Sequence, residues 1–236
     1  MTGTLFYVFV TVANLSLAVW MLIKSQRSHN DARFLLSLTL FGLTYDALII
    51  SLGAQIGSNE FLASLNRGRY LAHATLTPLY FIIAALLAEQ AGLRWAGPNS
   101  RLAAWVVCTF LIFGGVIATL QLEFEPVQIY GLLRYKVLSA QTPAWAHSFS
   151  ILVSVVADVF FIVLGIALWR TQRWPWLFLA ALAMFFASAP PVSFGFLLGS
   201  AGELLLNLAL IFSLLRFTAP LNNTLPNSSN EPANPA

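Results

Sequence analysis

The side chains in this sequence that could do chemistry are a few ionisable residues inside long apolar stretches. They are Asp46, His73, Asp158 and Glu203. A carboxylate at the centre of a membrane-spanning helix costs about 2.5 to 3.5 kcal/mol, so such groups face the bundle interior and find partners there. Asp46 and Asp158 could form a proton or cation pathway, or could simply be satisfied by hydroxyl groups of neighbouring helices.

A polar stripe runs along the stretch that contains His73. Its members follow one another at intervals of four, four and three residues, which places them on one face of a helix: Arg69, His73, Thr77 and Tyr80. In the last apolar stretch, Glu203 and Asn207 stand one helical turn apart. We expect Arg69, His73, Thr77, Glu203 and Asn207 to form one interior network, with Arg69 and Glu203 as a compensated pair. Ordinary interhelical hydrogen bonds are the alternative explanation.

The composition determines which elements must position these residues. Of 236 residues, 58% are hydrophobic and 9% are charged, against about 25% charged in a typical soluble domain. A spanning helix needs about 20 apolar residues. The sequence predicts an all-α, seven-helix transmembrane domain over residues 1–218, with spans near 4–23, 34–56, 70–92, 102–121, 147–169, 175–198 and 201–217. Residues 219–236, rich in Asn, Pro and Ser, are predicted to be a disordered cytoplasmic tail.

The basic residues predict the orientation of the chain. One side of the predicted bundle carries Lys24, Arg27, Arg33, Arg94, Arg101, Arg170, Arg173 and Arg216, and the other carries Arg67, Arg69, Arg134 and Lys136. Because the more basic side faces the cytoplasm, we expect an outside N-terminus and a cytoplasmic C-terminus, in a bacterial plasma membrane. The net charge of +3 is explained by contacts with anionic lipid heads, so we expect the lipid bilayer as partner and no nucleic acid.

The longest segment between spans covers residues 122–145 and is predicted to lie outside. Its portion from Ile129 to Leu138 is expected to be either a short interfacial helix or a plain loop.

Three stretches resemble the microbial (type 1) rhodopsins. Arg69-Tyr70 followed by Thr77-Pro78-Leu79 is similar to the third helix of that family. Ser188-Ala189-Pro190-Pro191 with Phe194 is similar to its sixth helix, where a downstream aromatic residue lines the retinal pocket. In the last stretch, counting back from Arg216 places Glu203 at the family's carboxylate position and Asn207 at the position of its retinal-binding lysine.

The departures from that family remove its chemistry. The only lysines are Lys24 and Lys136, both outside the spans, so no retinal Schiff base can form and no covalent cofactor is expected. Ala72 and Ile83 stand where the resemblance puts the proton acceptor and donor, which excludes the family's light-driven proton pumping. The resemblance leaves two alternatives. A carotenoid, retinoid or other apolar small molecule binds non-covalently near Tyr80, Pro191 and Phe194, or side chains fill the interior.

Three functions are compatible with these residues. The first is a non-enzymatic, rhodopsin-like binding or regulatory component of the membrane. The second is a proton- or cation-coupled transporter or channel that uses Asp46, Asp158 and Glu203. The third is a membrane enzyme in which these acids and His73 perform acid/base chemistry on a lipid. We expect no catalytic residue and no metal site, because the sequence has no Cys/His metal spacing, phosphate loop or nucleophile elbow. The oligomeric state stays open.

Overall fold

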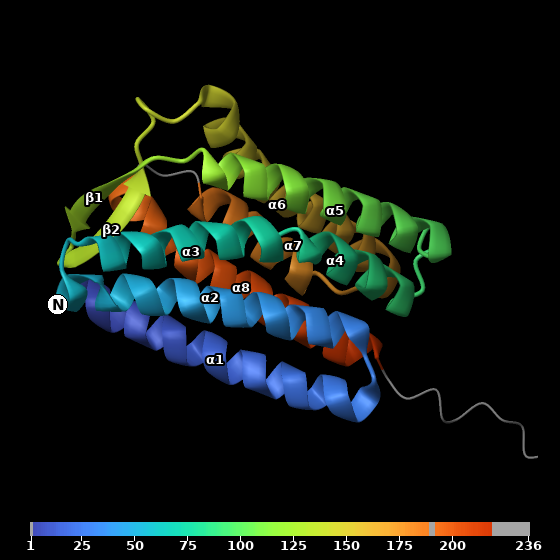
Figure 1. Cartoon of the computed structure of the whole chain (residues 1–236). Coiled ribbons are helices and arrows are strands. Elements are labelled where there is room, and N and C mark those ends of the chain that lie inside the picture. The colour runs from blue at the N-terminus through green and yellow to red at the C-terminus, as the bar shows by residue number, and fades with distance from the viewer. Residues whose placement is uncertain (1, 189–191, 219–236) are drawn as a thin grey trace, which may run out of the picture.

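The protein is a bundle of long helices lying roughly side by side, with a small β-hairpin at one end (Figure 1). The structure, a computed structural model, describes residues 2–188 and 192–218, and the side chains of residues 2, 150 and 192–195 fall outside that description. The elements are α1 (Thr2–Ser28), α2 (Asp31–Ile56), α3 (Glu60–Leu76), α4 (Leu79–Gln90), α5 (Pro98–Leu120), β1 (Phe124–Ile129), β2 (Leu132–Val137), α6 (Ala144–Gln172), α7 (Trp176–Ala187) and α8 (Val192–Phe217).

The helices are those of a multi-pass integral membrane protein. In the described part of the chain, six helices are long and apolar enough to cross a membrane, with α3 and α4 together forming one of them, Glu60–Gln90. The remaining apolar helix, α7, has 12 residues. Large apolar side chains such as Phe110 and Phe113 are 68% and 67% exposed, which suits lipid rather than water as their surroundings.

Local sequence signals explain where several helices begin and end. The Asn30 side chain accepts a hydrogen bond from the Arg33 N–H at 3.0 Å, and the Asn59 side chain accepts one from the Leu62 N–H at 2.8 Å, so both asparagines are N-caps. Pro78 separates α3 from α4 because it has no N–H to continue the backbone ladder. The span expected at 70–92 therefore begins ten residues earlier than predicted, since Asn59 caps α3 at Glu60.

The expectation of an interfacial helix or a plain loop at Ile129 to Leu138 was wrong. β1 and β2 form an antiparallel hairpin in which Ile129 pairs with Leu132. The two connecting residues, Tyr130 and Gly131, have φ of 53° and 76°, as a type I′ turn requires. Leu132 is fully buried against α1 and α2. A Tyr-Gly pair between two runs of aromatic and branched residues was the signal for this hairpin.

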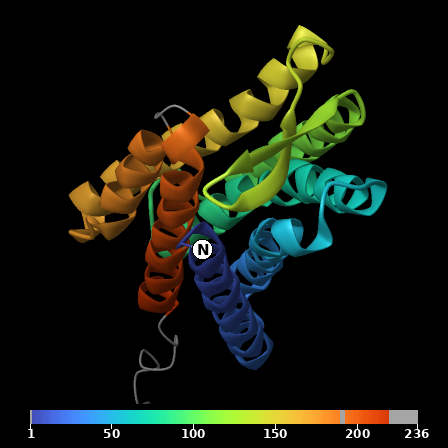
Figure 2. The same cartoon turned by 90° about the vertical axis from the view of Figure 1, so that its left-hand side faces the viewer.

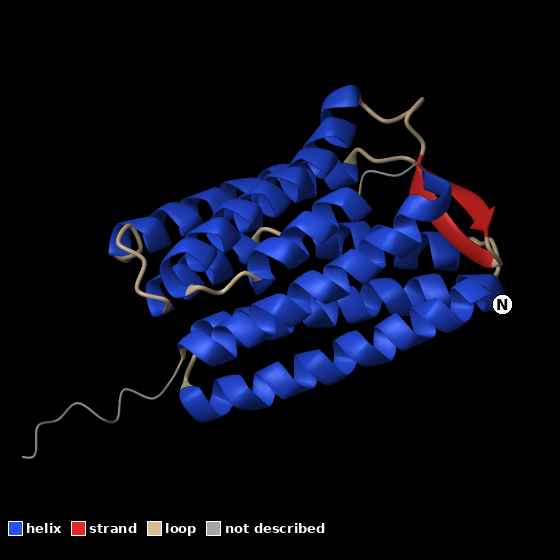
Figure 3. Cartoon of the chain, turned by 180° about the vertical axis from the view of Figure 1, so that it is seen from behind, coloured by secondary structure: helices blue, strands red, loops and turns tan. Residues whose placement is uncertain are grey.

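The hairpin defines one end of the bundle, which we call the hairpin end. Figure 3 shows its strands beside the N-terminus, and in Figure 2 it lies across the end of the helices. The helices pack in chain order around the bundle, and α8 returns to contact α1. α4 contacts α2, α5, α6 and α8, so it has a central position.

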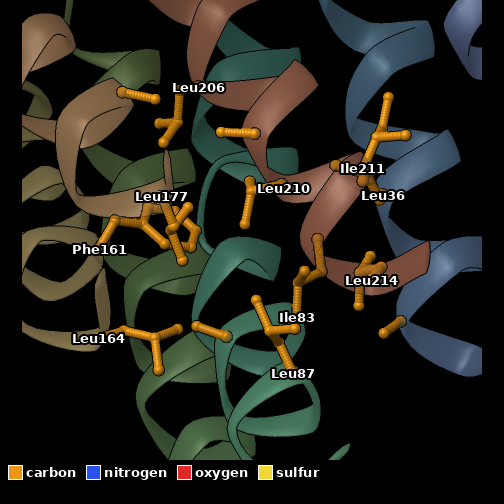
Figure 4. Packing of buried hydrophobic residues seen from close by; sticks show 14 of the residues in the cluster. Leu36, Ile83, Leu87, Phe161, Leu164, Leu177, Leu206, Leu210, Ile211 and Leu214 are labelled. Carbon is orange, nitrogen blue, oxygen red and sulfur yellow. The ribbon is translucent and has the colours of Figure 1, made fainter. Parts of the chain in front are cut away.

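The opposite end is filled by apolar side chains, which we call the apolar plug (Figure 4). These residues come from α2, α4, α6, α7 and α8 and are almost completely buried: Leu36, Ile83, Leu87, Phe161, Leu164, Leu177, Leu206, Leu210, Ile211 and Leu214. The plug occupies the half of the bundle that contains the turn between α1 and α2 and the end of α8. Polar residues gather in the other half.

The contact between α2 and the hairpin depends on Gly53. A Cβ atom at this position would lie 1.9 Å from the Leu133 carbonyl oxygen, so Gly53→Ala forces β2 away from α2. We expect a loss of about 1 to 3 kcal/mol in the free energy of unfolding, measured by reversible denaturation in detergent micelles. Gly199→Ala is the matched control, because a Cβ there meets no atom within 4 Å. It should be neutral or stabilising by up to about 1 kcal/mol, and equal effects at both positions would contradict the close approach.

Candidate functional site

A buried ion pair between α2 and α3 is the centre of the candidate site. The Arg69 Nε donates to Asp46 Oδ1 at 2.8 Å, and the two side chains are only 6% and 12% exposed. The His73 Nε2 lies 3.2 Å from the same oxygen. Arg69 also donates from a terminal guanidinium nitrogen to Asn66 Oδ1 at 2.6 Å. Asn66, Arg69 and His73 can share one site because intervals of three and four residues place them on one face of α3.

This network is anchored to the hairpin. The Asn66 side chain donates to the Leu62 carbonyl at 2.8 Å and accepts from the Tyr135 N–H of β2 at 3.4 Å. Asn66 is 1% exposed, and the geometry of the Arg69 guanidinium is therefore fixed from both α3 and β2.

The expected pairing of Arg69 with Glu203 was wrong. The counter-charge of Arg69 is Asp46, a residue that the sequence suggested only as part of an ion pathway. α2 and α3 are consecutive and are joined by a connection of three residues, which brings their facing sides together. Glu203 lies on α8, on the wall of the cavity that Arg69 and Asp46 also line.

That cavity, which we call the polar cavity, has a volume of about 310 Å³. Its lining combines charged, hydroxyl and apolar side chains: Tyr7, Asp46, Ile50, Arg69, Tyr70, His73, Arg134, Ser154, Met184, Ser188, Phe196, Gly199, Ser200 and Glu203. Within the described residues, neither Glu203 nor Arg134 forms an ion pair. The polar cavity therefore contains one satisfied charge cluster and two single charges of opposite sign.

A second cavity adjoins the first, and we call it the side cavity. It has a volume of about 380 Å³ and shares Tyr70, His73, Ser154 and Ser188 with the polar cavity. The rest of its wall comes mainly from α3, α5 and α6: Ala74, Thr77, Gly115, Thr119, Leu122, Val137, His147, Ile151, Val153, Val155 and Asp158. Asp158 is 7% exposed, and no described residue pairs with its carboxylate. Asp46 and Asp158 thus lie on different cavities, with His73 on both.

The rim of the polar cavity joins α1, α8 and the hairpin. The Tyr7 hydroxyl donates to the Phe196 carbonyl at 3.3 Å and lies 3.2 Å from the Ser200 hydroxyl. The Tyr7 and Phe196 rings stack at 6.2 Å, and the Arg134 guanidinium lies 5.3 Å from the Phe196 ring centroid. A cation–π contact of this kind holds the guanidinium at the cavity wall.

A buried hydrogen bond joins α4 to α8 near the polar cavity. The Tyr80 hydroxyl donates to Asn207 Oδ1 at 2.8 Å, and the Asn207 amide donates to the Glu203 carbonyl at 2.9 Å. Asn207 is fully buried, and Phe161 packs edge-on against Tyr80 at 5.4 Å. The nearby void, lined by Thr77 and Tyr80 among others, has only about 20 Å³, which is room for about one water molecule.

The described side chains thus leave little space beside Tyr80, and a non-covalent apolar ligand near this residue stays a prediction. Of the residues suggested for an apolar ligand there, Pro191 and the side chain of Phe194 lie outside the described residues. Nor do three or more metal-ligating side chains converge in the part of the chain that the structure describes.

No protein-family model matches this chain, and a search of curated proteins found no significant match. The resemblance to microbial rhodopsins therefore rests on the residues named above, and the function must be argued from the site itself.

Proposed function

We propose that this protein is a non-enzymatic, seven-span membrane protein that binds a small polar molecule reaching it from the outer face of a bacterial plasma membrane. α7 would supply the additional span, which is the sixth in chain order, the N-terminus would face outward, and the C-terminus would lie in the cytoplasm. One observation supports this proposal above all: a charged cavity near the hairpin end stops against a continuous apolar plug.

The chemistry of the polar cavity supports binding. Charged groups at membrane depth are costly, so those that persist mark functional sites. A volume of about 310 Å³ lies at the small end of ligand pockets, which typically measure about 300 to 1,000 Å³. The network of Asp46, Arg69 and Asn66 holds the wall rigidly, and a rigid wall lowers the cost of ordering on binding.

The apolar plug supports binding over conduction. A hydrated ion leaving the polar cavity toward the other end would meet Ile83, Leu210 and Leu214, each fully buried. Desolvating an ion against such side chains is prohibitive. We therefore expect the cavity to be accessible only from the hairpin end in this conformation.

Kinship with the microbial rhodopsins remains part of the proposal. The hydrogen bond from Tyr80 to Asn207 joins the third predicted span to the last helix at the position that the resemblance assigns to the retinal lysine. This contact is compatible with a chromophore site that has closed. A small apolar molecule such as a retinoid, if bound non-covalently, would suit the side cavity, whose walls are mostly apolar.

The second candidate is a proton- or cation-coupled transporter. Glu203 and Asp158 line adjoining cavities, and neither carboxylate is paired with a described residue. His73 lies between them on both walls. Transport would require a second conformation in which the apolar plug separates.

Thiol labelling distinguishes the two candidates, since the chain has one cysteine, Cys108, which is buried. In a Cys108→Ala background, Ser200→Cys places a thiol in the polar cavity, and Ala88→Cys places one in the plug region, where Ala88 is fully buried. We expect a membrane-impermeant thiol reagent to label Ser200→Cys in right-side-out vesicles at least about tenfold faster than in inside-out vesicles. Ala88→Cys should resist the reagent in both.

Each other result has a defined meaning. Labelling of Ser200→Cys from both faces would favour the transporter. Labelling only in inside-out vesicles would reverse the proposed orientation. Resistance of Ser200→Cys in both preparations, in protein that denaturant renders reactive, would refute an accessible cavity.

A further inference from the structure

Two charges on the polar cavity have no ionic partner among the described residues, and they have opposite signs. Asp46, Arg69 and His73 satisfy one another, whereas Glu203 and Arg134 do not reach any of them as an ion pair. Both residues are partly exposed and line the polar cavity, and a ligand that covered such a charge without supplying the opposite charge would leave it unpaired, at a cost of several kcal/mol. The two single charges therefore define what a ligand must supply.

The two charges lie beside different levels of α8. The Arg134 guanidinium lies over Phe196, and Glu203 follows Phe196 by seven residues, which is about 10 Å along a helix axis at roughly 1.5 Å per residue. Seven residues are close to two turns, so both positions share one face. Ser200 lies between them on that face, with its hydroxyl beside Tyr7.

Open space lies beside one residue of α8 between the two levels. Gly199 lines the cavity, and a Cβ atom built on it would have no heavy atom within 4 Å. Among the described residues, open space therefore adjoins α8 at Gly199, which lies between Phe196 and Glu203 in the chain.

We propose that the polar cavity binds a small zwitterion of the amino-acid class, with its carboxylate toward Arg134 and its ammonium toward Glu203. This inference rests on the proposed binding function and names its ligand. Charge-assisted hydrogen bonds of about 2.8 Å at each end would join such a ligand to Arg134 and Glu203.

Ligands with a single charge suit the cavity less well. A cation alone would neutralise Glu203 and leave Arg134 unpaired near the cavity rim, and an anion alone would leave Glu203 unpaired. A zwitterion satisfies both and adds no net charge to a cavity that already holds the Asp46–Arg69 pair. The hydroxyl groups of Tyr7 and Ser200, with Met184 opposite them in the lining, offer contacts for a side chain.

Binding to the purified full-length chain tests the inference. Each standard free amino acid is titrated by calorimetry, together with the amine that lacks its carboxylate and the acid that lacks its amino group; for L-leucine these are isoamylamine and isocaproic acid. We expect at least one amino acid to bind, and each of its two analogues to bind at least about tenfold more weakly, a difference of about 1.4 kcal/mol.

Two variants and one control test which residue binds the carboxylate of the ligand and which binds its ammonium. Glu203→Gln should weaken binding of the amino acid at least about tenfold and leave the affinity for the matched acid unchanged. Arg134→Gln should weaken the amino acid to the same extent and leave the matched amine unchanged. Lys136→Gln removes the same charge from the same strand, but Lys136 pairs with Glu125 at 2.9 Å and does not line the cavity, so binding should not change.

The possible outcomes distinguish a failure of the zwitterion inference from a failure of the proposed binding function. Binding of a singly charged analogue as tightly as the amino acid would overturn the zwitterion and keep a polar binding site. A second result would also contradict the zwitterionic ligand but not the binding site. This result is that no amino acid binds while the Ser200→Cys thiol is still labelled from one face only. If that thiol is also inaccessible, the binding function itself falls.

Discussion

Asp46→Ala should lower the free energy of unfolding by about 3 to 5 kcal/mol, the loss typical of breaking a buried ion pair by removing one partner. The substitution leaves the Arg69 guanidinium with its Nε facing no carboxylate in a site where its side chain is only 6% exposed. It also removes the acceptor that lies 3.2 Å from His73. Reversible unfolding of the purified protein in mixed micelles, followed by circular dichroism, measures the effect.

An exposed ion pair in the same chain provides the control. Glu89 and Arg101 lie 3.2 Å apart with side chains 37% and 44% exposed, and pairs of this kind contribute about 0 to 1 kcal/mol. Glu89→Ala should therefore have a small effect. The double variant Asp46→Asn, Arg69→Gln should recover part of the loss, because no charge is then left buried alone. If the effects of the single substitutions Asp46→Asn and Arg69→Gln add up strictly to the effect of the double variant, the coupling between the two residues is contradicted.

The partner of Arg69 shows what one sequence can and cannot specify. Intervals of four residues correctly place Arg69 and His73 on one face of α3, since helical periodicity is a property of the local chain. Tyr80, which belongs to the same predicted stripe, lies beyond Pro78 on α4 and donates instead to Asn207. Periodicity does not say which helix that face meets. The rhodopsin resemblance suggested Glu203, but the short connection between α2 and α3 brings Asp46 closer.

The same limit applies to the apolar residues. Phe161 is 1% exposed and Phe110 is 68% exposed, although both lie in helices of nearly uniform hydropathy. In a soluble protein the exposed face would be polar, and the sequence would reveal which side is buried. Lipid removes that contrast, because it is as apolar as the interior. The apolar plug could therefore not be located before the helices were placed.

The helical membrane class was predictable, and the hairpin was predictable only in part. Apolar stretches separated by basic residues indicate spanning helices regardless of their packing. At Tyr130 and Gly131, a two-residue turn with positive φ at both positions has a recognisable glycine signal. Its first residue is tyrosine instead of the usual asparagine, and the long polar segment around it concealed the pattern.

Leu210→Ala should cost about 2 to 5 kcal/mol in the free energy of unfolding, the range for truncating a fully buried leucine. Leu210 is 0% exposed and belongs to the apolar plug, a buried cluster that also includes residues of α4 and α7. Leu205→Ala is the control, because this leucine on the same helix is 47% exposed. Its loss should stay below about 1 kcal/mol, since lipid chains can fill the space that it leaves. Equal losses at the two positions would contradict the burial of Leu210.

We expect the apolar plug to keep the polar cavity closed from the opposite face even when Leu210→Ala lowers the stability of the protein. A void lined only by apolar side chains stays dry, so in the Leu210→Ala variant Ser200→Cys should still be labelled from one face alone. Leu210→Asn puts a hydrogen-bonding group into the same space and can hold water there. We expect it to raise labelling of Ser200→Cys from the opposite face at least about tenfold over the Leu210→Ala value. Equal labelling of Ser200→Cys from that face in the Leu210→Ala and Leu210→Asn variants would contradict this expectation. It would mean that the packed volume of the plug, and not its apolar character, closes the cavity.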